Sequence, residues 1–338
     1  MNPSADFDVA VVGAGPAGCA AAISCRKAGL RVVIIEGQPF PRFRPGETLH
    51  PGAEVLLDQL GVGAAVRKRT PIRFPGIWIG SENRRTFSAF GYDAQGTWLG
   101  FQVERAALDF ILSQQALSLG AVLLQPCYVT AVKRQTTQWV INTRSGQVRA
   151  SLIVDATGSA RSIANCLGLK TIAHSTRMIA QYGYGCGRAA QNFDCPSFTA
   201  SKNGWLWIAK VEPKKYQWIR TSWDPNSDTD LRLPTGVLHL EGILRTHGAD
   251  VTWRLLDKPA TSGYFAVGDA AAVLDPSSSS GVIRALATGI MAAHLAQCVI
   301  QQRNHLSAVT ASYNRWLRNW FLRDVRGLRA AYRCSPPQ

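Results

Sequence analysis

The pattern of apolar and polar positions predicts strands and helices that alternate near both ends of the chain. Apolar runs at 9–12 and 32–35 predict two buried strands, and the small-residue stretch 17–28 between them predicts a helix. Beyond them, the pattern predicts helices near 52–68, at 104–120 and from about 280, and strands within 71–101, near 121–132, 138–143 and 148–154, and through 174–255. Alternation at the ends around a β-rich middle is typical of an α/β fold that a second sheet interrupts.

The first strand–helix–strand unit carries the most specific motif. Gly13, Gly15 and Gly18 follow the first strand in the spacing G-x-G-x-x-G. The first glycine permits a tight turn, the second lets a pyrophosphate approach the backbone, and the third lets the helix pack closely on the sheet. The helix N-terminus favours phosphate, and Glu36 is placed to accept a hydrogen bond from a ribose hydroxyl. The unit predicts a dinucleotide site; a glycine-rich turn without a ligand is the alternative.

Two later segments distinguish flavin from nicotinamide. The sequence IVDATG is an apolar strand that ends in Asp155 and a turn at Gly158. The sequence YFAVGDAAA is another apolar strand, followed by Gly268 and Asp269. Asp269 is placed to bind a ribityl hydroxyl, and the segment 276–281 would bring backbone N–H groups toward the edge of an isoalloxazine ring. A simple NAD dehydrogenase needs no such segment, so the layout favours FAD.

The three motifs in this order resemble the flavoprotein monooxygenase superfamily, whose folds are similar to p-hydroxybenzoate hydroxylase, over about residues 7–300. We therefore expect an α/β fold, in which a Rossmann-like FAD-binding domain is interrupted by a β-sheet-rich substrate domain and followed by a C-terminal helix. The expected boundaries are 1–75, 102–170 and 260–300 for the FAD-binding domain, 76–101 and 171–259 for the substrate domain, and 301–338 for the helical segment.

The resemblance also implies the residues that bind FAD. Arg105 matches an arginine beside the pyrophosphate, Arg44 lies where an early arginine reaches the phosphates, and Val129 matches the position whose backbone meets the adenine. The complete expected set is Gly13, Gly15, Ala17, Gly18, Glu36, Arg44, Arg105, Val129, Asp155, Gly158, Gly268, Asp269, Pro276 and Gly281.

Three further segments look like a narrower branch, near flavin-dependent halogenases and geranylgeranyl reductases. They are RFRPGETLHPGA, NGWLWIAKVEP and GDAAAVLDPSSSSGVIRALATG. The branch includes the modifying flavoproteins of lysine ε-oxidase, glycine oxidase and quinohemoprotein amine dehydrogenase. This resemblance implies hydroxylation of a tryptophan side chain in a partner oxidase precursor, leading to cysteine tryptophylquinone. The alternatives are a small-molecule FAD-dependent hydroxylase, halogenase or reductase, and a non-catalytic flavin-binding maturation factor.

One departure from the branch bears on halogenation. Tryptophan halogenases carry W-x-W-x-I-P, whereas here Trp205 and Trp207 are followed by Ile208, Ala209 and Lys210. The missing Ile-Pro puts halogenation in doubt but does not exclude it. Two tryptophans on one face of a strand are also a good packing unit, which is the alternative to a role beside the flavin.

The cofactor defines the expected chemistry. Reduced flavin reacts with oxygen, and the protein must exclude water and aim the oxidant at the substrate. We expect NAD(P)H as the external reductant, with transient contact because the sequence has no second GxGxxG. Glu47 and His50, both in the loop RPGETLHPG, are the candidates for moving protons. A turn-forming or capping role is the alternative for each.

Composition is typical of a soluble globular enzyme. The eight scattered cysteines and six histidines show no disulfide or metal pattern, and we expect a cytoplasmic protein with free thiols. The sequence shows neither a nucleic-acid motif nor an apolar run that approaches a membrane span.

The formal charge of +15 includes a cluster of arginines near the C-terminus. A helical wheel gathers them opposite apolar residues, which predicts a docked amphipathic helix with a solvated basic face. Docking of an acidic protein partner on that face is the second interpretation. The arginines are Arg315, Arg318, Arg323, Arg326, Arg329 and Arg333, and the apolar residues are Tyr313, Leu317, Trp320, Phe321, Leu328 and Tyr332.

Overall fold

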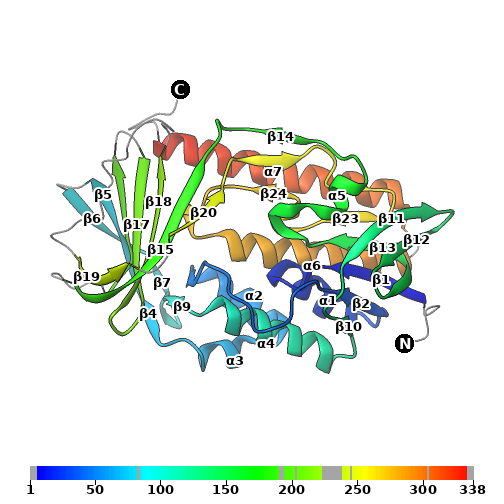
Figure 1. Ribbon diagram of the computed structural model, residues 1–338, viewed down its shortest axis with the longest axis horizontal. Helices are drawn as coiled ribbons and strands as arrows, with labels where there is room; N and C mark the ends of the chain where they lie inside the picture. The colour runs from blue at the N-terminus through cyan, green and yellow to red at the C-terminus, as the bar shows by residue number, and fades with distance from the viewer. Residues whose placement is uncertain are drawn as a thin grey trace.

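The computed structural model describes residues 6–81, 84–189, 194–201, 204–222, 238–243, 246–302 and 304–332. Parts of the predicted strand region 174–255, and the end of the predicted C-terminal segment, lie outside these residues. Within them, the chain has the predicted α/β fold with two large sheets and a long C-terminal helix (Figure 1).

The first large sheet has the order β10-β2-β1-β13-β12-β11, with β23 beside β13 and β22 beside β23. Pairing is parallel along β10, β2, β1, β13 and β23, and antiparallel elsewhere. Its strands are β1 (Asp6–Val12), β2 (Val32–Ile35), β10 (Val122–Leu124), β11 (Val129–Gln135), β12 (Gln138–Thr143), β13 (Gly146–Asp155), β22 (Ala260–Thr261) and β23 (Tyr264–Ala266).

The second large sheet has the order β19-β15-β18-β17-β16-β5-β6, with β20 also beside β15. It brings the segment near residue 80 against strands from the middle of the chain, because β5 pairs in parallel with β16. Its strands are β5 (Gly76–Ser81), β6 (Arg84–Ala89), β15 (Ile179–Ala189), β16 (Ser197–Ser201), β17 (Gly204–Glu212), β18 (Lys215–Ser222), β19 (Leu238–Ile243) and β20 (His247–Asp250).

Short strands form smaller sheets at the junctions. One has the order β3 (Thr48–Leu49), β9 (Gly100–Gln102) and β4 (Ile72–Phe74), and β7 (Tyr92–Asp93) pairs with β8 (Gly96–Thr97). Another has the order β14 (Thr171–Ala173), β21 (Arg254–Leu256) and β24 (Ala272–Val273). In this last sheet, β14 and β21 come from the two ends of the predicted substrate segment 171–259, and β21 pairs with β24, which follows Gly268.

The helices follow the predicted positions with two differences, one of which is the short helix α5, which the sequence pattern does not predict. The region 52–68 holds two helices, because Gly61 adopts a left-handed conformation at φ +84° and ends the first of them. The helices are α1 (Pro16–Lys27), α2 (Gly52–Leu60), α3 (Gly63–Arg67), α4 (Arg105–Ser118), α5 (Ser162–Cys166), α6 (Gly281–Ile300) and α7 (Leu306–Tyr332).

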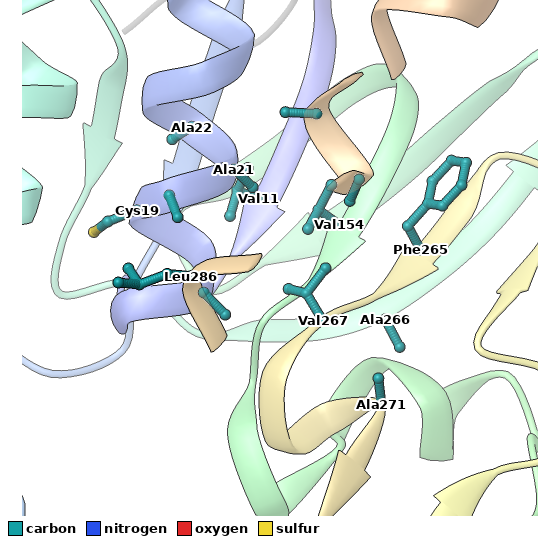
Figure 2. Packing of buried hydrophobic residues seen from close by; sticks show 14 of the residues in the cluster. Val11, Cys19, Ala21, Ala22, Val154, Phe265, Ala266, Val267, Ala271 and Leu286 are labelled. Atoms are coloured by element: carbon teal, nitrogen blue, oxygen red, sulfur yellow. The ribbon is translucent and has the colours of Figure 1, made fainter. Parts of the chain in front are cut away.

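Small side chains let α1 approach both the first sheet and α6. Figure 2 shows Ala21 of α1 and Leu286 of α6 in one buried cluster with Val11 of β1 and Val154 of β13. A Cβ at Gly289 of α6 would lie 2.2 Å from the carbonyl oxygen of Ala17, so the two helix backbones are in direct contact there.

The C-terminal helix is amphipathic, as the wheel predicts. Its described arginines are exposed, while a row of apolar and aromatic residues is buried. Figure 1 shows α7 running along the molecule toward the second sheet. Arg333 lies outside the described residues. The buried row is Val309, Tyr313, Leu317, Phe321, Val325, Leu328 and Tyr332.

Candidate functional site

The parallel strands of the first sheet bring the predicted motifs to one edge. Because β1, β2, β13 and β23 run the same way, their carboxyl ends meet there. The register pairs Val12 with Asp155, and Asp155 with Ala266. The glycine turn, Glu36, the Asp155 turn and the Gly268 turn therefore all follow this edge.

The three motif glycines have different surroundings. Gly13 has φ +103°, and a Cβ there would lie 2.3 Å from the carbonyl oxygen of Ala156. A Cβ at Gly18 would lie 1.9 Å from the carbonyl oxygen of Gly13. A Cβ at Gly15 would have one described atom beyond its chain neighbours within 4 Å, which is Nη2 of Arg42 at 3.9 Å. Two glycines therefore serve close packing, and Gly15 exposes backbone that a phosphate can approach.

Glu36 is buried and fixes the glycine turn from the side. Its carboxylate accepts hydrogen bonds from the backbone N–H groups of Ala14, at 2.7 Å, and Gln38, at 2.8 Å. Arg42 forms an ion pair with it at 2.7 Å. The Glu36 carboxylate lies beside the glycine turn. A ribose hydroxyl would bind it in addition to the two backbone N–H groups and Arg42.

The arginine beside the turn is Arg42. The sequence prediction named Arg44, which is exposed and donates a hydrogen bond to Gln38 at 3.0 Å. Both arginines belong to the motif RFR. They are two positions apart, and no local feature of the sequence shows which of them lies beside the glycine turn. Arg42 is therefore the residue that the sequence reasoning missed, and the role of Arg44 stays a prediction.

Arg105 opens α4 next to the same loop. It pairs with the buried Asp109 at 3.1 Å and donates to the carbonyl oxygen of Pro45 at 3.3 Å. The segment that enters β11 at Val129 also lies nearby, since the backbone N–H of Cys127 donates to the carbonyl oxygen of Glu36 at 2.8 Å. Both positions border the region where the motif places the AMP half of FAD.

Asp155 is saturated by protein hydrogen bonds. Oδ1 accepts from the backbone and hydroxyl of Thr157, and Oδ2 accepts from the backbone of Ala164, at 3.0 Å, and from the Tyr264 hydroxyl, at 2.9 Å. Burial raises the pKa of this carboxyl. Asp155 thus shapes the turn, and Gly158, with φ +65° and nothing within 4 Å of a built Cβ, is its open part.

Asp269 is in the opposite situation. Its side chain is exposed, and no residue that the structure describes hydrogen-bonds to it. Burial by surrounding protein nevertheless raises the pKa of this carboxyl, while the charges of Arg284, Arg105 and Arg254 act to lower it. A carboxylate that is recessed, reachable by solvent and without a protein hydrogen bond suits a ligand hydroxyl.

The predicted flavin-facing segment is a tight turn. Pro276–Ser278 forms a short 3-10 helix, Ser279 has φ +47°, and α6 begins at Gly281, where a built Cβ would meet nothing within 4 Å. The side chain of the N-cap residue Ser280 makes no capping hydrogen bond to α6. The N–H groups of a first helical turn suit a ligand, and their contact with the flavin ring stays a prediction.

Glu47 joins the loop RPGETLHPG to the second large sheet. Its buried carboxyl accepts hydrogen bonds from the Tyr184 hydroxyl, from Nε2 of Gln217 and from the backbone N–H of Gly46. Tyr184 and Gln217 are neighbours on β15 and β18. Burial raises the pKa of Glu47. Sequence reasoning found Glu47 but not its partners, which are 137 and 170 positions away.

His50 is exposed and acts as a helix cap. Its Nδ1 accepts a hydrogen bond from the backbone N–H of Gly52 at 3.1 Å, at the start of α2. Its ring packs edge-on against Phe90, with centroids 4.9 Å apart. Burial lowers the pKa of this imidazole. These contacts account for His50 structurally, and its catalytic role stays a prediction.

The tryptophan pair is part of the core. Trp205 and Trp207 lie two positions apart on β17, and both are buried. Phe198 packs against Trp205 with ring centroids 5.7 Å apart. The packing interpretation therefore explains the pair without a ligand.

One expectation about apolar runs needs correction. The sequence pattern predicts no apolar run that approaches a membrane span. By length and composition, however, α6 could cross a membrane. A single such helix is weak evidence, because core helices meet the same criterion. In the structure α6 packs against α1, α2 and α7.

Comparisons with known proteins agree with this geometry. Residues 8–41 match the family model of FAD dependent oxidoreductases. The chain is 28% identical to a 1H-pyrrole-2-carbonyl-(peptidyl-carrier protein) brominase of Pseudoalteromonas luteoviolacea, over 87% of this chain and 78% of the brominase. It is 26% identical to a menaquinone reductase of Mycobacterium tuberculosis, over 87% of this chain and 78% of the reductase.

The fold is also that of a solved halogenase. CmlS, a flavin-dependent halogenase, superposes with a TM-score of 0.87 at 23% identity, over 99% of this chain and 66% of that chain. The chain therefore has a flavin-dependent halogenase-like fold, and its first strand–helix–strand unit matches the FAD dependent oxidoreductase model. The narrower tryptophylquinone branch finds no support among these relatives.

Asp269→Asn should weaken FAD binding and leave the free energy of unfolding nearly unchanged, because no described residue donates a hydrogen bond to that carboxylate. We expect the dissociation constant, measured by flavin fluorescence titration, to rise about tenfold. Asp155→Asn is the matched control. Its amide would face hydrogen-bond donors, so we expect a loss of about 1–3 kcal/mol in stability. Normal FAD affinity in Asp269→Asn would contradict the assignment.

The buried Glu47 predicts a pH-dependent stability. Because its pKa is raised in the fold, its contribution is complete below about pH 4.3, the ordinary glutamate value. The contribution is lost as the pH rises through the raised pKa. Urea unfolding of wild type and Glu47→Gln should therefore show the stability difference shifting toward the variant as pH rises. A difference that stays constant with pH would mean that Glu47 titrates as it does in the unfolded chain.

Proposed function

We propose that this chain is an FAD-dependent, halogenase-type oxidoreductase that modifies a small aromatic substrate. Two of the relatives that cover most of the chain are enzymes whose names refer to a pyrrole group and to menaquinone. They support the small-molecule alternative better than hydroxylation of a tryptophan in an oxidase precursor, and they give no support to a non-catalytic factor. The observation that carries the proposal is Glu47, which links the cofactor loop directly to the second sheet.

The chain's own groups divide the work of binding. The backbone at Gly15 and the N-terminus of α1 suit the pyrophosphate, Asp269 suits a ribityl hydroxyl, and the N-terminus of α6 suits the edge of the ring. When bound, FAD supplies the oxidising chemistry, through oxygen and the reduced ring. We assign NAD(P)H as the ultimate reductant and the cytoplasm as the compartment, where reduced thiols persist.

Glu47 is the proton-handling residue in this proposal. Burial raises the pKa of its carboxyl and so favours the neutral form, and Tyr184 and Gln217 fix its position. His50 already uses Nδ1 to cap α2, which makes it the weaker choice.

The test supplies the purified chain with FAD, a flavin reductase, NADH, oxygen, bromide or chloride, and a pyrrole or indole. We expect a halogenated ring that depends on halide. Glu47→Gln should lower turnover about a hundredfold and leave FAD affinity unchanged. A hydroxylated ring formed without halide would overturn the halogenase assignment. Oxidation of a precursor tryptophan, with no turnover of small aromatics, would restore the protein-modifying alternative.

The exposed basic face of α7 suggests how the substrate arrives. Arg315, Arg318 and Arg326 lie on this face, away from the buried row. We propose that it binds an acidic carrier protein that presents the aromatic acyl group, as the name of the related brominase describes for its own substrate. A cationic face on a chain of net charge +15 would steer such a partner.

The paired substitutions Arg318→Glu and Arg326→Glu should raise KM for a carrier-bound substrate about tenfold at low salt. KM for the free aromatic should not change, because the reacting site is untouched. Arg149→Glu, on an exposed position of β13, is the charge-matched control. Equal effects on bound and free substrate, or equal effects of the control, would contradict docking on α7.

A further inference from the structure

A fully buried carboxylate precedes the flavin-facing turn. Asp275 is 0% exposed and lies two residues after the end of β24. Its Oδ1 accepts hydrogen bonds from the backbone N–H of Ser277, at 3.0 Å, and from the Ser277 hydroxyl. Its Oδ2 accepts from Nε1 of Trp253, at 3.1 Å, and from the Tyr332 hydroxyl, at 2.8 Å. Both oxygens are satisfied by groups that are distant in sequence or belong to the turn itself.

Tyr332 brings the end of the C-terminal helix into this network. Its hydroxyl lies 2.7 Å from the Ser277 hydroxyl, and its ring stacks on Trp253 with centroids 5.9 Å apart. Trp205 of the second sheet lies beside the same hydroxyl. Burial and the charge of Asp275 raise the pKa of Tyr332, so the phenol is a hydrogen-bond donor at neutral pH.

The turn held by this network has an uncommon backbone. Ser279 has φ +47°, a left-handed conformation that residues with a side chain adopt rarely. The next residues begin α6, at the open position of Gly281. The direction of the first N–H groups of α6 therefore depends on a turn that is fixed on one side by Asp275 and, through it, by α7.

We propose that Tyr332 and Asp275 form a lock that sets the conformation of 275–281 and thereby aims the N-terminus of α6 at the bound flavin. The C-terminal helix α7 then helps to fix the geometry of the cofactor site. Tyr332 is a positioning residue, since it acts through Asp275 and Ser277. The identity of the ligand rests on the proposed function, whereas the lock itself is a property of the protein alone.

The test compares two tyrosines on one helix. Tyr332→Phe removes the hydroxyl that reaches Asp275. Tyr313→Phe is the matched control, because Tyr313 is 0% exposed and its hydroxyl donates to the carbonyl oxygen of Ala266 at 2.6 Å, away from the turn. Hydrogen exchange of the 275–281 peptide is measured in the FAD-free chain. FAD affinity and the visible flavin spectrum are measured separately.

We expect Tyr332→Phe to speed exchange of 275–281 about tenfold, to weaken FAD binding and to shift the flavin bands. Tyr313→Phe should leave the exchange of 275–281 as in the wild type. If Tyr332→Phe folds poorly, Trp253→Phe takes its place, because it removes the other donor to Oδ2 of Asp275. We expect the same changes from it. Equal exchange in the Tyr332 and Tyr313 variants would overturn the lock. A wild type that binds no FAD would contradict the proposed function, and the exchange comparison would still decide the lock.

Discussion

The close approach of α1 to α6 is the constraint on which the rest of the site depends. Gly289 allows the backbones to touch at Ala17, and a Cβ at Gly268 would lie 3.0 Å from the Cβ of Ala17. Larger side chains at these positions would separate the helices and move the Gly268 turn. Because α1 starts at the glycine turn and α6 starts at the predicted flavin edge, this contact sets the distance between the two helix N-termini that we propose bind one ligand.

The carboxylates of the site divide by whether the protein already satisfies them. Asp155 and Asp275 each accept several protein hydrogen bonds, and they fix the turns that follow β13 and β24. Asp269 is the exception, since it is exposed and no described residue hydrogen-bonds to it. A carboxylate without a protein hydrogen bond remains open to a ligand hydroxyl. Glu47 is satisfied as well, and its partners join its loop to the second sheet.

Local patterns were enough for most of the elements and for the glycine motif. The break between α2 and α3 was missed because an isolated Gly61 within a helical pattern gives only a weak stop signal. The choice of Arg42 over Arg44, the Tyr264 partner of Asp155 and the Tyr184 partner of Glu47 all depend on contacts between distant segments. No spacing in the sequence encodes them. The substrate could not be predicted for a different reason: the shared motifs build the cofactor site, and a fold does not define the molecule it acts on.

If the glycine turn and Asp269 hold the two halves of one FAD, the chain must distinguish FAD from FMN, because FMN lacks the AMP half that the turn and Glu36 would hold. Titration of the purified chain with FAD and, in parallel, with FMN measures this difference. We predict one FAD per chain and binding of FMN about a hundredfold weaker. Equal affinity for both flavins, or saturation with neither, would contradict a two-part FAD site.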